Sequence, residues 1–203
     1  LILTMFPAIT WARSAADHNA RGMNYVCQGE LDKAISEFTA AIEGDPEYIK
    51  AYINRGGVYV IMQKYELALN DFDLVLALAP VYAKAYNNRA YVYVKIGKYD
   101  QAIGDVNKAL AICPEEAIFY DTRGCAYAGK RMFEEALQDL NKAISMDSLL
   151  AIAYFHRAEV FEQIGKMAEA LSDYGAYIEY AKDDKNNTEL VIAKQRYAKI
   201  SSM

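Results

Sequence analysis

The chain has 203 residues, 54% of them hydrophobic, and a formal net charge of −5. This hydrophobic content is ample for a packed core, and only four prolines and eleven glycines leave little room for disorder. An acidic chain without a basic stripe lacks the electrostatic basis for binding nucleic acid. Cys27, Cys113 and Cys125 form no CxxC pair, which argues against a disulfide framework or a zinc ribbon.

Residues 1–14 form an apolar N-terminal tail that carries no charge up to Ala12. Its large apolar residues are Leu1, Ile2, Leu3, Met5, Phe6, Ile9 and Trp11. A helix needs about 20 residues to span a bilayer, so the tail is too short, but it resembles the apolar part of a secretory signal. Two interpretations stay open. A signal remnant favours export to a periplasm or cell surface over the cytoplasm, whereas an assembly segment needs a partner surface.

From residue 15 onward, the same residue types return every 34 positions. The second repeat shows the pattern with Tyr52, Arg55, Gly56, Tyr59, Ala68, Phe72 and Pro80. Five repeats of this length fill residues 15–48, 49–82, 83–116, 117–150 and 151–184. The period and the residue types resemble the tetratricopeptide repeat, except that Arg55 stands where the family usually has Leu. The resemblance implies an all-α fold, a right-handed superhelical solenoid of helix-turn-helix repeats.

The residues of each repeat also predict two helices, because apolar residues recur at helical spacing on both sides of a turn. The turn positions are Gly29, Gln63, Gly97, Arg131 and Gly165. Gly56 is expected where the two helices of a repeat cross closely, so a bulky side chain there would push them apart. Residues 185–203 predict a last helix with one apolar face, which would cap the exposed end of the stack.

An arginine recurs in every repeat, and an acid follows it sixteen residues later. The pairs are Arg21 with Glu37, Arg55 with Asp71, Arg89 with Asp105, Arg123 with Asp139, and Arg157 with Asp173. Sixteen residues lead up the first helix, around the turn and back along the second. We therefore predict five ion pairs that join the two helices of each repeat, bidentate where geometry allows. The alternative is an anion-binding ladder of arginines in the groove, which the matched acids disfavour.

The sequence contains no recognisable catalytic motif and predicts neither a cofactor nor a metal ligand. His18 and His156 lie four repeats apart, so they cannot share a metal ion or a proton relay. Asn186 begins a glycosylation sequon, which has meaning only if the chain is secreted. We therefore expect a protein that is not an enzyme.

In the tetratricopeptide family, the first helices of the repeats line a concave groove that holds segments of partner proteins. By register, the resemblance assigns to this groove Lys50, Ile53, Asn54, Lys84, Asn87, Asn88, Tyr91, Lys95, Asp121 and His156, and also Cys125, Glu159 and Gln163. Asn54 and Asn88 can hydrogen-bond a ligand backbone, since amides both donate and accept. The lysines predict a basic middle of the groove and Glu159 with Glu162 an acidic end, which suits a partner with an acidic centre.

The family's chaperone carboxylate clamp needs two lysines, two asparagines and a further basic residue over three repeats. Asn54 and Lys84 match two of these places, but Asn19, Met23 and Asn88 occupy the others. The clamp is incomplete, so binding to a chaperone's C-terminal carboxylate is not expected.

Two functions follow from this sequence. The first is a scaffold that binds a protein or peptide in the groove, without nucleic-acid or membrane partners. The second is a structural subunit that assembles head-to-tail into a filament through the apolar tail and the ends of the solenoid.

Overall fold

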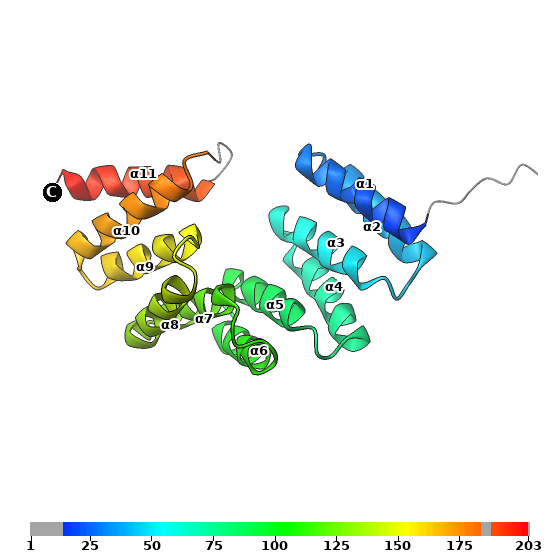
Figure 1. The fold of residues 1–203 in the computed structure, drawn as a ribbon, viewed down its shortest axis with the longest axis horizontal. Coiled ribbons are helices and arrows are strands. Elements are labelled where there is room, and N and C mark those ends of the chain that lie inside the picture. The colour runs from blue at the N-terminus through cyan, green and yellow to red at the C-terminus, as the bar shows by residue number, and fades with distance from the viewer. Residues whose placement is uncertain (1–13, 184–187, 203) are drawn as a thin grey trace, which may run out of the picture. The chain divides into compact units, whose positions relative to one another are not determined.

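The computed structural model describes residues 14–183 and 188–202, and the regular structure in these ranges is entirely helical (Figure 1). The helices are α1 (Ala15–Cys27), α2 (Leu31–Gly44), α3 (Ile49–Ile61), α4 (Tyr65–Leu78), α5 (Ala83–Lys95), α6 (Tyr99–Ile112), α7 (Ala117–Gly129), α8 (Phe133–Met146), α9 (Ala151–Gln163), α10 (Met167–Tyr180) and α11 (Thr188–Ser201). The chain divides into an N-terminal part, residues 1–79, and a C-terminal part, residues 80–203. The all-α prediction is confirmed. Residues 1–13 of the apolar tail and Asn186 lie outside the described residues.

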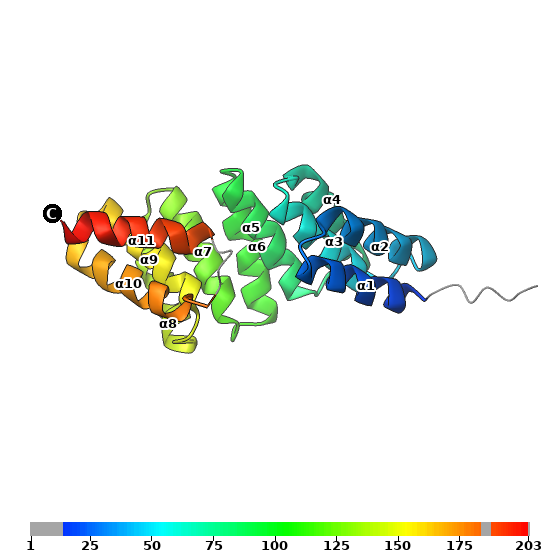
Figure 2. The same ribbon diagram turned by 90° about the horizontal axis from the view of Figure 1, so that it is seen from above.

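Each repeat is a hairpin of a 13-residue first helix and a 14-residue second helix. The chain enters the first hairpin through Ser14, whose side chain accepts a hydrogen bond from the Asp17 backbone while the Asp17 side chain accepts one from the Ser14 backbone. This capping box satisfies backbone donors that would otherwise have no partner. In the C-terminal part, α11 lies beside α10 and covers the last repeat (Figure 2). No helix in the described part of the chain is long and apolar enough to cross a membrane.

The turn between the two helices has the same geometry in all five hairpins. In the first, Gly29 N–H bonds to Val26 and Glu30 N–H bonds to Tyr25, the pattern of a Schellman motif. The turn residue needs a left-handed backbone, and φ is 75° at Gly29, 58° at Gln63 and 62° at Arg131. The last two residues therefore adopt a conformation that costs an L-residue about 1 kcal/mol.

The two helices of a hairpin cross closely because a small residue on one faces a large one on the other. A Cβ built on Gly56 would lie 2.7 Å from the Phe72 ring, and one on Gly124 would lie 2.8 Å from Leu140. In the third repeat Ala90 takes the glycine's place, and there Val106 replaces the ring. The alanine of the second helix, such as Ala68, is fully buried at this crossing.

The arginines lie against the acids sixteen residues further on. In the fourth repeat, Arg123 Nε donates to Asp139 Oδ2 at 2.6 Å and Nη2 donates to Oδ1 at 2.8 Å, and the second, third and fifth repeats have the same bidentate geometry. The guanidinium carbon of Arg123 also lies 5.6 Å and 5.9 Å from the ring centres of Tyr120 and Tyr127. An arginine in the place of the family's Leu thus satisfies a buried acid and stacks between two rings.

The first repeat differs because His18 stands where the other repeats have tyrosine. Glu37 bonds His18 Nδ1 at 2.7 Å through one oxygen and Arg21 Nη2 at 3.0 Å through the other. The Arg21 side chain is 37% exposed, about twice the value of its counterparts. His18, which the sequence did not indicate as a partner of Glu37, thus changes a bidentate pair into a shared carboxylate.

Candidate functional site

The residues assigned to the groove all lie on first helices, but they are not equally accessible. Lys50, Ile53 and Asn54 lie on α3 of the N-terminal part, and the C-terminal part holds Lys84, Asn87, Asn88, Tyr91 and Lys95 on α5, Asp121 on α7, and His156 on α9. The three lysines are exposed, whereas Asn87 is 7% and Asp121 is 3% exposed. Both side chains are buried between helices, and their direct contact with a partner stays a prediction.

A hydrogen bond between polar side chains joins two neighbouring first helices in each part. In the N-terminal part, Asn54 Nδ2 donates to Asn19 Oδ1 at 2.8 Å. In the C-terminal part, His156 Nδ1 donates to Asp121 Oδ1 at 2.9 Å. The members of each pair are 35 residues apart, one more than the repeat length, because first helices of adjacent repeats pack side by side. Asn54, expected to bind a ligand backbone, thus uses its amide nitrogen inside the fold.

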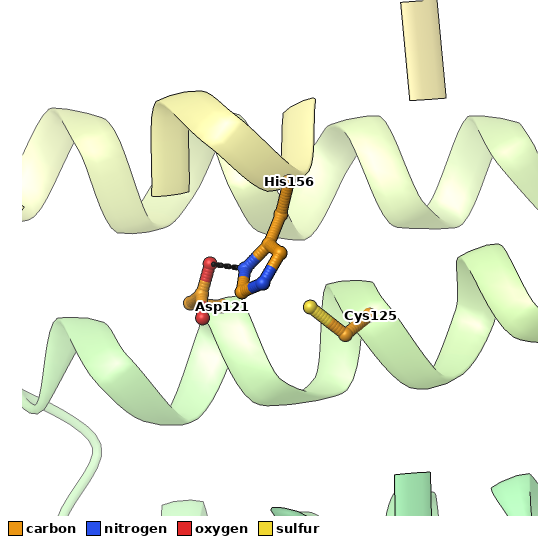
Figure 3. Close-up of side chains that lie close together, drawn as sticks. All are labelled: Asp121, Cys125 and His156. Carbon is orange, nitrogen blue, oxygen red and sulfur yellow. Dashed lines mark hydrogen bonds and ion pairs between the residues drawn. The ribbon is translucent and has the colours of Figure 1, made fainter. Parts of the chain in front are cut away.

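Three side chains that can each hold a metal ion or move a proton meet between α7 and α9 (Figure 3). Asp121 and Cys125 are one turn apart on α7, and His156 reaches them from α9. One ligand atom from each lies within 4.8 Å of the other two. Figure 3 shows the His156 ring reaching from α9 toward both side chains of α7, with Nδ1 bonded to the Asp121 carboxylate and the Cys125 sulfur nearby. From the sequence we expected only that His18 and His156 share no site. The meeting of His156 with Asp121 and Cys125 was not predicted.

Burial and charge act in opposite directions on this cluster. Burial by itself lowers the pKa of His156, but the charges and hydrogen bonds of Asp121 and Cys125 together outweigh it and hold the pKa well above its ordinary value. Burial raises the pKa of the Cys125 thiol above its ordinary value. Burial therefore favours the neutral thiol of Cys125, whereas the Asp121 carboxylate favours a protonated His156.

The cluster borders a pocket of about 490 Å³ at the C-terminal ends of α5, α7 and α9. The polar and charged residues around it are Lys95, Tyr99, Cys125, Arg131, His156, Glu159 and Gln163. Lys95 Nζ lies 5.0 Å from the centre of the Tyr91 ring. This cation–π contact holds the ammonium at the edge of the pocket. The pocket thus presents both signs of charge within one small area.

The acidic end expected from Glu159 and Glu162 is only half present. Glu162 Oε1 accepts a hydrogen bond from Arg196 Nη1 of α11 at 2.6 Å, and its Oε2 accepts one from the Tyr174 hydroxyl at 3.0 Å. Its charge is therefore compensated within the fold, and burial and this carboxylate together raise the pKa of Tyr174. Glu159, which lines the pocket, has a pKa raised by burial.

Cys125, assigned to the groove by register, lines the pocket, but its closeness to Asp121 and His156 was not predicted, nor were Tyr99 and Arg131 as pocket residues. A search for ionisable residues 35 positions apart would have found Asp121 and His156. Lys84, expected in the basic middle of the groove, lies with its Nζ 3.7 Å from Glu116 Oε1, so an acidic side chain stands beside it.

Comparison with known proteins agrees with this architecture. Models of the tetratricopeptide repeat match residues 49–82, 83–116 and 122–186. No curated protein matches the sequence significantly. TTC0263, a thermophilic TPR protein of Thermus thermophilus, aligns with a TM-score of 0.80 at 20% identity, over 93% of this chain and 100% of its own.

Two further solved structures share the fold. PilW, a type IV pilus biogenesis factor, aligns with a TM-score of 0.78 at 18% identity, over 93% of this chain and 86% of its own. YrrB, a TPR protein with an unusual peptide-binding site, aligns with a TM-score of 0.58 at 20% identity, over 89% of this chain and 92% of its own. Proteins built from these repeats in general mediate protein–protein interactions and act as non-catalytic scaffolds. With its 34-residue hairpins, its Schellman turns and these matches, the chain belongs to the tetratricopeptide-repeat family.

Proposed function

We propose that this protein is a non-enzymatic scaffold that binds a segment of a partner protein on its first helices. The pocket between α5, α7 and α9 carries the proposal, because it is a concavity on the face where the repeats present variable side chains. The residues that hold the hairpins together, such as Arg123 and Gly124, are engaged in ion pairs and close packing within the hairpin. Lys95, Glu159 and Gln163 of the pocket take no part in these contacts and can therefore serve recognition.

The charges around the pocket define the partner more closely. Lys95 and Arg131 are exposed, and Glu159 lies among them on the pocket wall. A segment that carries an acidic and a basic side chain complements this surface, whereas the sequence suggested a partner with an acidic centre. The peptide-binding site of YrrB supports peptide recognition as a use of this fold.

The position of Cys125 supports a role without catalysis. Cys125 lies in the middle of α7, and so the backbone N–H groups around it are hydrogen-bonded along the helix. A nucleophile needs donors aimed at the oxyanion that its attack creates. The helix backbone around Cys125 supplies no such donors.

A peptide library panned on the immobilised full chain tests the proposal. Selected peptides are then titrated against the wild type, Lys95→Glu in the pocket, and Lys142→Glu on α8 outside it, which makes the same change of charge. We expect Lys95→Glu to weaken binding about tenfold, equivalent to about 1.4 kcal/mol, and Lys142→Glu to leave it unchanged. Binders that are insensitive to Lys95→Glu, or equally sensitive to both changes, would show that the partner does not use this pocket.

Filament formation through residues 1–13 stays a prediction from the sequence, because those residues lie outside the described part of the chain. A comparison of the size of the protein with and without them tests it.

A further inference from the structure

We propose that Asp121, Cys125 and His156 form a binding site for one divalent transition-metal ion of the zinc class. The three side chains supply a carboxylate oxygen, a sulfur and an imidazole nitrogen, each within 4.8 Å of the other two (Figure 3). The proposal goes beyond partner binding and does not depend on it, because none of its observations involves a partner.

The distances allow an ion to bind with small movements. Zinc bonds of about 2.0–2.3 Å at a tetrahedral angle place ligand atoms about 3.5 Å apart. The longest separation in the cluster therefore has to shorten by about 1.3 Å at most, which a rotation of the Cys125 or Asp121 side chain can supply. Both residues project from the same face of α7 one turn apart, so the backbone need not move.

The chemistry of the donors selects the class of ion. Thiolate and imidazole favour zinc and its neighbours among the transition metals, whereas calcium and magnesium require oxygen ligands. Binding replaces the thiol proton of Cys125 and the proton shared by His156 and Asp121, and these protons leave to solvent. No oxidation or reduction takes place, and the ion takes up the charge of the carboxylate and the thiolate.

Packing between neighbouring first helices does not by itself require an aspartate, a cysteine and a histidine at these positions. In the N-terminal part, the places of Asp121 and His156 are taken by Asn19 and Asn54, which join two first helices with one amide hydrogen bond. Met23 occupies the place of Cys125 there. The fold therefore bridges first helices without ionisable donors, and the C-terminal part nevertheless brings three of them together.

The site has room for a further ligand on its open side. Cys125 and His156 line the pocket of about 490 Å³, while Asp121 is buried behind them. Three protein ligands leave the fourth tetrahedral position facing that pocket, where water or a donor from solution completes the shell.

Cobalt(II) is the probe for the test, since a cobalt–thiolate bond gives a charge-transfer band in the near ultraviolet. The full chain is used without a histidine tag and with its thiols reduced. We expect one Co²⁺ per chain, the charge-transfer band, and displacement by Zn²⁺. Cys125→Ser should remove the band, and His156→Gln and Asp121→Asn should each weaken Co²⁺ binding at least about tenfold.

Matched controls separate this site from adventitious binding. A Cys27→Ser, Cys113→Ser double variant removes the two exposed thiols and should keep the band, as should His18→Gln, which removes the other histidine. The proposal is overturned if the wild type shows no band, if Cys125→Ser keeps it, or if the double variant loses it.

A thermal melt provides a second readout that does not depend on the Cys125→Ser protein being folded. In the Cys27→Ser, Cys113→Ser background, Zn²⁺ should raise the melting temperature, because an ion that binds only the folded chain stabilises it. Adding His156→Gln to that background should abolish the rise. An equal rise in both proteins would also refute the site.

Discussion

Replacing Arg123 by leucine, the residue that the family usually has at this place, tests what the arginine ladder contributes. The change leaves the Asp139 carboxylate, whose side chain is 8% exposed, without its two charge-assisted hydrogen bonds. Leucine fills the space between Tyr120 and Tyr127 but offers no donor. The predicted effect is therefore that of an unpaired buried charge and not that of a lost contact.

The structure sets the size of the effect. Removing one partner of a buried ion pair typically costs about 3–5 kcal/mol. Asn107, which accepts from Arg123 Nη1 at 2.8 Å, is exposed, so water replaces that bond at little cost. We therefore expect the free energy of unfolding to fall by about 3 kcal/mol, the lower end of that range.

Arg21→Leu is the matched control. It makes the same change in the first repeat, but the Arg21 side chain is 37% exposed and Glu37 keeps its bond to His18. Exposed ion pairs contribute little to stability, so the free energy of unfolding should fall by less than about 1 kcal/mol.

The assay is urea unfolding of the full chain, monitored by circular dichroism. The slope of the unfolding free energy against urea concentration must match that of the wild type. Combining Arg123→Leu with Asp139→Ala removes both charges and should recover at least half of the loss. The reasoning fails if Arg123→Leu costs no more than Arg21→Leu, or if the double variant is less stable than Arg123→Leu alone.

Three further predictions use the same unfolding assay or the size of the protein in solution. Gly56→Ala should destabilise the protein by about 1–2 kcal/mol, because the added Cβ would lie 2.7 Å from the Phe72 ring. The adjacent Gly57→Ala should stabilise it by about 1 kcal/mol through helix propensity, because no atom lies within 4 Å of that Cβ. Equal effects of the two substitutions would contradict the close crossing of the helices. Gln63→Gly should stabilise by about 0.5–1 kcal/mol, since φ is 58° there, and a loss of stability would argue against strain at that turn. Deleting residues 1–13, which spares the cap of α1, should leave the size unchanged in light scattering if the protein is a scaffold; a change from polymer to monomer would favour the filament.

Much of the fold was predictable because the repeat encodes it locally. The 34-residue period, the turn residues and the sixteen-residue offset between Arg123 and Asp139 all relate positions within one hairpin. Such relations depend on helix geometry and a short turn, both of which the sequence determines directly. Even the non-glycine turn at Arg131 could be assigned, because its place in the period is the same as that of Gly97.

Contacts between repeats were not predictable in the same way. Arg157 Nη1 donates to Asn141 Oδ1 of the preceding repeat at 2.7 Å, a bond that a pattern within one repeat cannot reveal. Glu162 bonds Arg196 because α11 docks on α10 beside α9, and the docking depends on side-chain packing along the whole last helix. For the same reason, the pairing of Glu162 with Arg196 was not predicted.

The candidate site arises from this division between contacts within and between repeats. Positions that hold a hairpin together recur in every repeat and cannot vary without cost, as the paired Arg123 and Asp139 show. Positions that face the next first helix have to fit only one neighbour, so an amide pair is enough at Asn19 and Asn54. The chain can then place ionisable donors in the equivalent positions of a later repeat while the hairpins stay intact. Metal binding at Asp121 and recognition beside Lys95 should therefore be separable by mutation, each lost without unfolding the repeats that carry it.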